Sequence, residues 1–385
     1  MKILFTPSDN DATSGAFLCM TGFIKSARKQ FHIDPLVILP NSGDGAKLLE
    51  EAGIPYILIR SYAWTINIDR KDFLSVKVKW RIKRILNWVA IRKIRKLIRQ
   101  WNPDIVYNNT TWGYVGALSG FNEKKPVIWH FREIMELQQN MTVLCGWVKT
   151  RKYFRQADQV IAVSHYVLNY YKNMVSPSKS NVIYEGVNKN DSFCPNHLIF
   201  QNQSANIIMV GGFLKDKGQD CLIDAIDYVK KNTDFDIKVN FIGNDNTEYG
   251  KYCRKKCRDL NLDNIISFLG RRNDVSKFLS KSDIAIIASG NEAFGRTTVE
   301  ALLSGCLVIA ANAGATPELI QDNISGLLFK REKKNGLGQR IIFAIENAER
   351  MQHIAKVGQD FAVQNYTADI NAFNIYSKCL KRYES

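Results

Sequence analysis

The sequence predicts an α/β protein with two domains, each formed by a parallel β-sheet and its covering helices. The chain has 385 residues, more than one ordinary hydrophobic core needs. Short runs rich in β-branched residues alternate with longer helical patterns, which is typical of βαβ units. This alternation stops in a polar segment, 192–204, and then begins again, which indicates two domains.

The individual elements follow from the same alternation. The first half has expected strands at 2–5, 35–39, 56–59, 104–107, 126–130 and 159–163. The second half has expected strands at 206–210, 238–242, 265–269, 283–288 and 307–310. Because 192–204 is rich in Asn, Gln, Ser and Pro, we place the domain boundary there and predict domains 1–195 and 196–367. A last helix is expected at 368–383, within the C-terminal segment 368–385.

Composition narrows the class of protein. With 45% hydrophobic and 23% charged residues, the chain resembles soluble globular proteins, and its apolar runs fall short of the ~20 residues that span a bilayer. The first residues lead directly into a strand and Pro7, so we expect no signal peptide and a cytoplasmic location. The eight cysteines lack C-x-x-C spacing, which favours reduced thiols. Cys253 and Cys257 could share a helix face, but no nearby ligands complete a zinc site.

The charge is strongly positive, at +16, and must attract a polyanion: nucleic acid, anionic lipid or a phosphorylated substrate. Segment 77–99 contains ten basic residues and no acidic one, with apolar residues every three or four positions. This pattern predicts a basic amphipathic helix. Its apolar stripe could pack on the protein's own sheet, or the helix, 77–100, could bind an anionic membrane surface; the two interpretations are compatible.

The most informative segment is 289–314, SGNEAFGRTTVEALLSGCLVIAANAG. It follows an expected strand, turns at Gly290 and Gly295, and continues as a helix at about 297–304. A helix that begins after a glycine turn offers free backbone N–H groups and a positive dipole end to a diphosphate. Glu292 and Glu300 could accept hydrogen bonds from hydroxyl groups, although either one alone could be a helix cap or a surface residue.

This segment resembles the E-x7-E signature of glycosyltransferase family 4, through Glu292, the Phe294-Gly295 pair and Glu300. Further similar segments, spread over most of the chain, are VGGFLKDKG from Val210, FLGRRNDV from Phe268, ADQVIAVS from Ala157, VIYEGVN from Val182 and GATPELI from Gly314. The resemblance implies the GT-B fold: two Rossmann-like domains that face each other across a cleft, with the last helix packing back on the N-terminal domain. The family's bacterial members imply a role in surface-polysaccharide assembly.

The resemblance also implies roles for residues of the C-terminal domain. Glu292 would bind hydroxyls of the transferred sugar, Glu300 the ribose, and Lys217 the diphosphate. Backbone N–H groups around Gly295, Arg296 and Thr297 would complete the phosphate cradle and stabilise the leaving group. Phe294 belongs to the same motif, and the loops at Gly243 and Arg271 are expected to shape the pocket for the base and the sugar.

Two candidates lie in the N-terminal domain, and one position departs from the family. His130, in WHFRE, resembles the histidine that faces the donor, although a lone histidine is more often structural. Gly15 resembles the first glycine of a loop that approaches the donor phosphate or the acceptor, but Ala16 replaces the usual second glycine. The family most often has an arginine where this chain has Gly212, and losing that donor should weaken diphosphate binding unless Arg271, Arg272, Arg296 or another cation replaces it.

We therefore expect a retaining hexosyltransferase that uses a nucleotide diphosphate sugar, UDP more often than GDP, and a lipid-linked saccharide acceptor. No carboxylate pair suited to a double displacement is recognisable, so we expect front-side attack assisted by the departing phosphate. No metal cofactor is expected: Asp9-Asn10-Asp11 has the D-x-D form of a cation site, but its place before the glycine loop favours a structural turn.

Other classes of protein are less consistent with the sequence. A nucleic-acid-binding protein would explain the charge, yet no nucleic-acid-binding motif is present. A dinucleotide-dependent oxidoreductase would need G-x-G-x-x-G after the first strand, and that motif is absent. A catalytically weak or inactive sugar-nucleotide-binding partner of a glycosyltransferase complex stays open because of Gly212.

Overall fold

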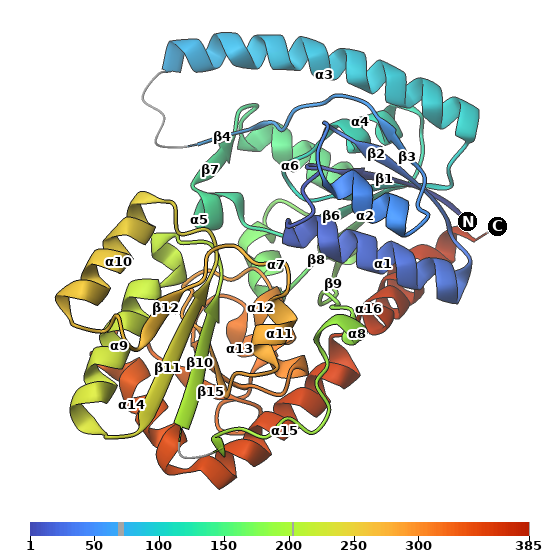
Figure 1. Cartoon of the computed structure of the whole chain (residues 1–385). Coiled ribbons are helices and arrows are strands. Elements are labelled where there is room, and N and C mark those ends of the chain that lie inside the picture. The colour runs from blue at the N-terminus through green and yellow to red at the C-terminus, as the bar shows by residue number, and fades with distance from the viewer. Residues whose placement is uncertain (68–72, 202–203, 385) are drawn as a thin grey trace. The chain divides into compact units, whose positions relative to one another are not determined.

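The computed structural model describes residues 1–67, 73–201 and 204–384 (Figure 1). The chain forms two compact units: the N-unit, Met1–Gly186 with Ala368–Ser385, and the C-unit, Val187–Thr367. The chain therefore first passes from the N-unit into the C-unit at 186/187, ahead of the expected boundary at 195/196. The reason is that the polar segment packs on the C-unit: Cys194 N–H donates to the carbonyl of Leu303 (3.3 Å) and Ser304 Oγ donates to the carbonyl of Ser192 (2.8 Å).

The N-unit is built on a parallel sheet, in which the described residues form seven strands in the order β3-β2-β1-β5-β6-β8-β9. All six strands expected in this half are present within two residues of their predicted ends. β9 and the separate antiparallel pair β4–β7 were not predicted, because each has three residues and no clear alternation. The strands are β1 (Lys2–Pro7), β2 (Asp34–Leu39), β3 (Tyr56–Leu58), β4 (Thr65–Asn67), β5 (Ile105–Asn109), β6 (Val127–Phe131), β7 (Met141–Val143), β8 (Gln159–Ala162) and β9 (Ser180–Val182).

The C-terminal helix belongs to the N-unit, as predicted, where it lies beside α1 (Figure 1). Ser26 Oγ donates to Asp369 Oδ1 (2.7 Å), and the rings of Phe31 and Tyr376 stack with centroids 3.8 Å apart. The helices of this unit are α1 (Gly15–Phe31), α2 (Gly45–Glu51), α3 (Phe73–Trp101), α4 (Val115–Asn122), α5 (Met135–Gln139), α6 (Trp147–Gln156), α7 (His165–Tyr171) and α16 (Ala368–Ile375), which continues as a π-helical turn (Tyr376–Leu380).

The C-unit repeats the design with six parallel strands among its described residues, in the order β12-β11-β10-β13-β14-β15. The five strands expected here are confirmed within two residues, and only the short β15 was missed. The strands are β10 (Ser204–Val210), β11 (Asp236–Ile242), β12 (Ile266–Phe268), β13 (Ile284–Ile287), β14 (Leu307–Ala311) and β15 (Leu327–Phe329). The helices are α8 (Lys189–Ser192), α9 (Gln219–Asn232), α10 (Glu248–Asp259), α11 (Val275–Leu279), α12 (Arg296–Leu303), α13 (Thr316–Leu319), α14 (Gly336–Glu346) and α15 (Ala348–Asn365).

The strand order fixes where each unit can hold a ligand. In the N-unit the order reverses between β1 and β5, and in the C-unit it reverses between β10 and β13. At such a switch point the loops after neighbouring strands run to opposite faces of the sheet, which leaves a crevice at the carboxyl ends of the strands. Each unit therefore has one preferred edge for a site.

Candidate active site

Two helices begin at the switch point of the C-unit. α9 follows β10 through Gly218, and α12 follows β13 through Gly295; both glycines have positive φ angles, +78° and +103°. A Cβ atom at Gly218 would lie 2.8 Å from the carbonyl oxygen of Ala288, so only glycine lets α9 start this close to the end of β13. Two helix N-termini therefore lie at one sheet edge, an arrangement that favours bound anions.

Lys217 and Glu292 meet at this edge. Lys217 Nζ donates to Glu292 Oε1 at 2.6 Å, and the two side chains are 34% and 17% exposed. The lysine comes from the loop after β10 and the glutamate from the loop after β13, so the pair spans the switch point. The structure thus brings together two residues that the sequence singled out from positions far apart in the chain.

Glu300 is also paired with a cation. Arg296 Nε donates to Glu300 Oε1 at 2.7 Å across one turn of α12. Thr297 lies in the same first turn and is partly buried. Phe294 differs from the other motif residues because its side chain is only 5% exposed and packs edge-on against Tyr366, at a centroid distance of 6.1 Å. Its ring therefore packs within the C-unit, and the predicted part of Phe294 in ligand binding stays a prediction.

The loops after β10, β11 and β12 pack backbone against backbone. Gly211 N–H donates to the carbonyl of Ile242 (2.8 Å), and Gly243 N–H donates to the carbonyl of Gly270 (2.9 Å). A Cβ atom at Gly243 would lie 1.9 Å from the carbonyl oxygen of Gly211. This stacking carries the exposed Arg271, which follows Gly270, to the same sheet edge as Lys217.

Gly212 leaves space at the position where the sequence resemblance led us to expect an arginine. A Cβ atom at this position would meet nothing described within 4 Å. Of the cations that could replace the arginine, Arg272 pairs with Asp274 (3.0 Å) and Arg296 with Glu300.

The sequence did not single out Arg331 or Asp216. Arg331 Nη1 lies 3.6 Å from Asp216 Oδ1 and directly over Gly290, 2.1 Å from where a Cβ atom would stand. Asp216 in turn accepts from Asn291 Nδ2 (3.0 Å), and its carbonyl accepts from Gly290 N–H (3.1 Å). Asp216 therefore ties the loop that carries Lys217 to the loop that carries Glu292. The only signal in the sequence was its position next to that lysine.

His130 lies at the end of β6 in the N-unit and is completely buried. Its Nδ1 is 2.6 Å from the hydroxyl of Tyr107, and its Nε2, 3.7 Å from Glu185 Oε1, has no hydrogen-bond partner within the described residues. Burial, reinforced by the charge of Arg132, holds the pKa of His130 well below its ordinary value. The imidazole is therefore neutral at physiological pH.

A polar cluster surrounds the carboxyl ends of β5 and β6. Arg132 forms an ion pair with Glu185 and donates from Nε to Asn109 Oδ1 (2.6 Å). Glu133 accepts from both the N–H (2.6 Å) and the Oγ1 (2.5 Å) of Thr111, and burial raises its pKa to about 7. This cluster was not predicted from the sequence, although two charged residues directly after a buried strand were a signal.

The loop after β1 holds the D-x-D sequence and Gly15. Thr13 donates from its N–H and its Oγ1 to Asp11 Oδ1, both at 2.7 Å, and Ser14 Oγ donates to Asp9 Oδ2 at 3.1 Å. Gly15 is the first residue of α1, with open space around its Cα. The described residues contain no group of three His, Cys, Asp or Glu side chains able to hold a metal ion.

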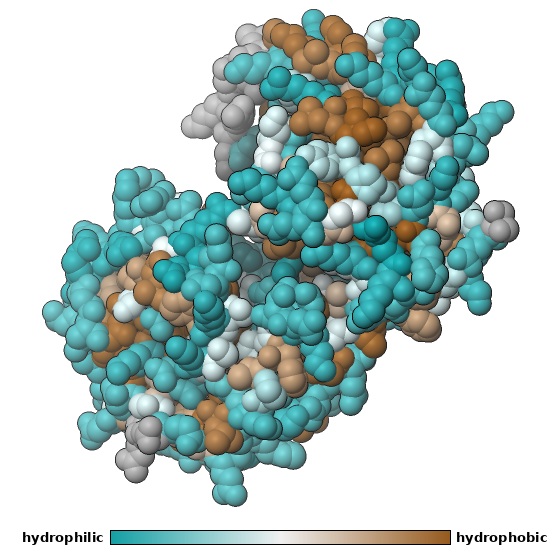
Figure 2. All heavy atoms as spheres, turned by 45° about the vertical axis from the view of Figure 1, so that its right-hand side comes forward, coloured by the Kyte–Doolittle hydropathy of each residue, from teal (hydrophilic) through white to brown (hydrophobic). Residues whose placement is uncertain are grey.

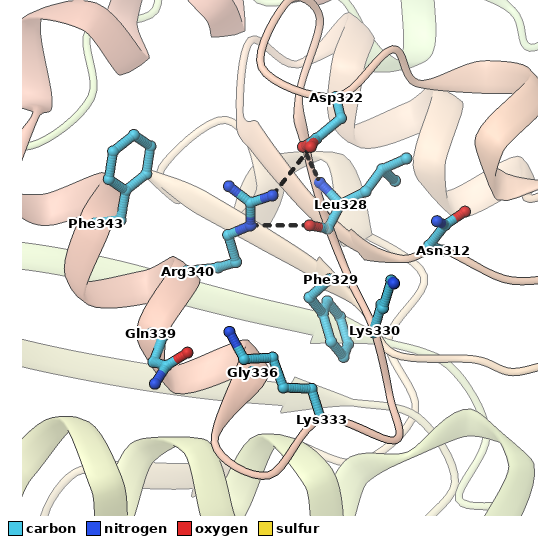
Figure 3. A pocket seen from close by; sticks show the side chains of 10 residues that line it. All are labelled: Asn312, Asp322, Leu328, Phe329, Lys330, Lys333, Gly336, Gln339, Arg340 and Phe343. Carbon is cyan, nitrogen blue, oxygen red and sulfur yellow. Dashed lines mark hydrogen bonds and ion pairs between the residues drawn. The ribbon is translucent and has the colours of Figure 1, made fainter.

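A separate pocket of about 550 Å³ lies in the C-unit beside β15 and α14 (Figure 3). Arg340 is fixed in it by bonds to the carbonyl of Leu328 (2.9 Å) and to Asp322 Oδ2 (3.0 Å). None of the sequence-predicted site residues lines this pocket, so we assign it no part in the predicted site.

Comparison with known families matches both parts of the chain. The sequence family described as Glycosyltransferase Family 4 matches residues 29–191. The family described as Glycosyl transferases group 1 matches residues 195–361. An uncharacterized glycosyltransferase of Methanocaldococcus jannaschii is 31% identical over 296 residues, which cover 73% of this chain and 76% of that protein. The chain is a member of glycosyltransferase family 4.

A further relative and a solved structure are also similar to this chain. The capsular polysaccharide biosynthesis glycosyltransferase CapH of Staphylococcus aureus is 27% identical over 246 residues, 60% of this chain and 65% of CapH. The crystal structure of HepE from Anabaena in complex with UDP has a TM-score of 0.80 at 24% identity and covers 98% of this chain and 99% of HepE. The predicted GT-B fold is thereby confirmed, and the chain is a glycosyltransferase by family.

Proposed function

We propose that this family 4 protein transfers a hexose from a UDP-sugar to a saccharide acceptor with retention of the anomeric configuration. The observation that carries the proposal is the Lys217–Glu292 pair at the C-unit switch point, flanked by the N-termini of α9 and α12. UDP is the preferred donor nucleotide because structural neighbours include HepE in complex with UDP-glucose. GDP is the competing nucleotide.

Donor binding exchanges the partners of these charged groups. The diphosphate takes the ammonium of Lys217 and the first N–H groups of α12, from Gly295 to Thr297, as hydrogen-bond donors. Glu292 is then released to accept hydrogen bonds from sugar hydroxyls. Glu300, which already lies one helical turn from Arg296, takes the ribose hydroxyls in the same way.

The reaction then needs stabilisation of the departing UDP. Lys217 and the helix N-termini face the negative charge that grows on the diphosphate as the glycosidic bond breaks, which is the electrostatic contribution that usually dominates catalysis. The acceptor hydroxyl attacks from the same face, and the departing phosphate oxygen takes its proton. In this scheme neutral His130, whose Nε2 has no hydrogen-bond partner among the described residues, would bind a sugar hydroxyl.

A lipid-linked acceptor and a peripheral membrane location are supported by α3. The second half of the helix packs on the N-unit through Ala90, Ile94 and Ile98, each at most 2% exposed. The first half instead exposes apolar side chains, including Ile82 (53%), and apolar surface gathers at the top of the N-unit in Figure 2. The exposed basic residues of this half, among them Arg81 and Lys83, would hold this surface on anionic lipid at the inner face of the plasma membrane. No described helix is long and apolar enough to pass through a bilayer.

The test begins with binding and ends with stereochemistry. A thermal-shift panel of UDP- and GDP-sugars should show stabilisation by one UDP-sugar, because a ligand that binds the folded chain raises its stability. Incubation of that sugar with acceptor extracts, followed by NMR of the product, should give the donor's own anomeric configuration. An inverted product would refute retention, and stabilisation by GDP-sugars alone would refute the choice of UDP.

A second candidate function is supported by the open space at Gly212: a sugar-nucleotide-binding partner with little or no catalytic activity. It predicts binding of the UDP-sugar without hydrolysis or transfer. Turnover that disappears in Glu292→Gln and Lys217→Met would exclude it.

A further inference from the structure

A pocket of about 720 Å³ lies in the N-unit between the first half of α3 and the segments near α4 and α6. Five aromatic residues line it: Trp64, Trp80, Trp88, Tyr114 and Tyr153. Its volume falls within the ~300–1,000 Å³ range of small-molecule sites, and apolar walls with few polar groups are typical of such sites. None of the residues assigned above to donor binding lines it.

The floor of the pocket is held by ring stacking and a hydrogen bond. Trp64, 1% exposed, stacks on Tyr114 with ring centroids 4.9 Å apart, and its indole Nε1 donates to the carbonyl of Thr111 at 2.8 Å. The polar atom of the indole is thus satisfied on the protein side. The ring planes are held in place as an apolar surface before any ligand arrives.

The mouth is both apolar and cationic. Trp88 (52%) and Ile85 (63%) are exposed along α3, which leaves apolar area uncovered around the opening. The exposed Arg84 and Lys149 line the same pocket, and no acidic side chain occurs among its described lining residues. Apolar walls with two cations at the rim match an aliphatic chain that carries an anionic head group.

The floor also connects to the polar cluster at the carboxyl edge of the N-unit sheet. The residue that Trp64 contacts, Thr111, donates two hydrogen bonds to Glu133. The floor of the pocket is therefore linked to this edge through Thr111. Exposed apolar residues of α3 that do not line the pocket, including Val78 and Ile82, remain available for the bulk membrane.

We infer that this pocket binds the aliphatic chain of the acceptor's carrier, a single-chain lipid phosphate, with Arg84 and Lys149 at the phosphate. The inference rests on the proposed transferase function and names the acceptor class. The carrier is favoured over membrane phospholipid because the pocket is concave, adjoins the polar sheet edge, and is separate from the outward apolar residues of α3.

Cys145 provides a site-specific probe because it lines the pocket and is partly exposed. The full-length chain is alkylated with N-ethylmaleimide, with and without dodecyl phosphate below its critical micelle concentration, and rates are followed peptide by peptide. Dodecyl phosphate should slow alkylation of Cys145 about fivefold or more at saturation, since a bound ligand covers the thiol. Cys194 and Cys221, partly exposed in the C-unit, should react at unchanged rates.

Charge variants test the head-group contact. Arg84→Glu and Lys149→Glu should each raise the dodecyl phosphate concentration for half-protection about tenfold, as expected for loss of a charge-assisted hydrogen bond. Arg81→Glu is the matched control, because it makes the same charge change on α3 at a position that does not line the pocket. It should leave protection unchanged.

Three results would overturn the inference: an unchanged Cys145 rate with dodecyl phosphate, equal effects of Arg84→Glu and Arg81→Glu, or equal protection by monomeric dihexanoylphosphatidylglycerol, a two-chain phospholipid. UDP-glucose thermal shifts are measured on the same variants. If UDP-glucose gives no thermal shift with the unmodified chain, that result counts against the proposed function. Protection of Cys145 reports on the pocket alone.

Discussion

Glu133 should make the stability of the N-unit fall as pH rises. The side chain is 9% exposed, and its carboxylate accepts two hydrogen bonds from Thr111. Burial outweighs these bonds and raises the pKa from an ordinary 4.5 to about 7. The perturbation is Glu133→Gln, which keeps an acceptor oxygen for Thr111 and removes the titration.

The magnitude follows from proton linkage. Between pH 4.5 and about 7 the folded chain binds more protons at Glu133 than the unfolded chain does. The free energy of unfolding therefore falls across this window by about 3 kcal/mol, at about 1.4 kcal/mol for each tenfold change in proton affinity. The Gln variant lacks this loss, so its stability relative to the unmodified protein should rise by the same amount from low to high pH.

His130 makes the free energy of unfolding change with pH in the opposite direction. Its lowered pKa gives stability that is present above about pH 6.5 and is lost as pH falls. That contribution is common to both proteins and cancels in their difference.

Tryptophan fluorescence is a suitable assay because all seven tryptophans of the sequence lie in the N-unit. Urea unfolding followed by this signal gives the free energy of unfolding of the N-unit at each pH. The curve of this free energy against pH for the unmodified protein is then subtracted from the curve for Glu133→Gln. Glu123→Gln is the control: hydrogen bonds from Arg99 and Arg95 lower the pKa of Glu123 to about 2, so its difference curve should be flat from about pH 5 to 8. A flat curve for Glu133→Gln as well would refute the reasoning.

The other predictions concern the donor site. Lys217→Met should weaken binding of both UDP and UDP-glucose about tenfold or more, whereas Glu292→Gln should weaken only UDP-glucose; calorimetry showing equal losses of UDP binding would contradict these roles. Gly212→Arg should tighten UDP binding about tenfold and steepen its salt dependence, because the space is open; unchanged affinity would mean that another cation already serves the diphosphate. Gly243→Ala should destabilise the C-unit by about 3 kcal/mol, measured by hydrogen exchange in β10 and β11, because its Cβ would collide with the carbonyl of Gly211. Transfer should persist in excess EDTA, and loss restored by magnesium or manganese would contradict a metal-free reaction.

The sequence predicted the strands well because a buried parallel strand is a continuous apolar run between loops, a signal that needs no tertiary information. β4 and β7 were missed because their three-residue pairing depends on the fold that brings Thr65 opposite Val143. Motif spacing identified Glu292 and Glu300, since both lie in one strand–turn–helix segment. Arg132 and Glu185 are 53 positions apart and meet only because β6 and the end of β9 lie at one sheet edge. Such a pair has no local signature.

The charged residues of the motif at the C-unit edge form ion pairs that could exchange partners with a bound ligand. Both glutamates of the motif are paired with a cation, Glu292 with Lys217 and Glu300 with Arg296. Fully buried pairs would be costly to separate, because each charge would lose its partner in a medium of low dielectric constant. These side chains are 17–34% exposed, and water can solvate them while they change partners. Under the proposed function, a diphosphate that took Lys217 would free Glu292 in the same step, and binding of the phosphate would prepare the carboxylate for the sugar. This coupling explains why Glu292→Gln should spare UDP while Lys217→Met should not.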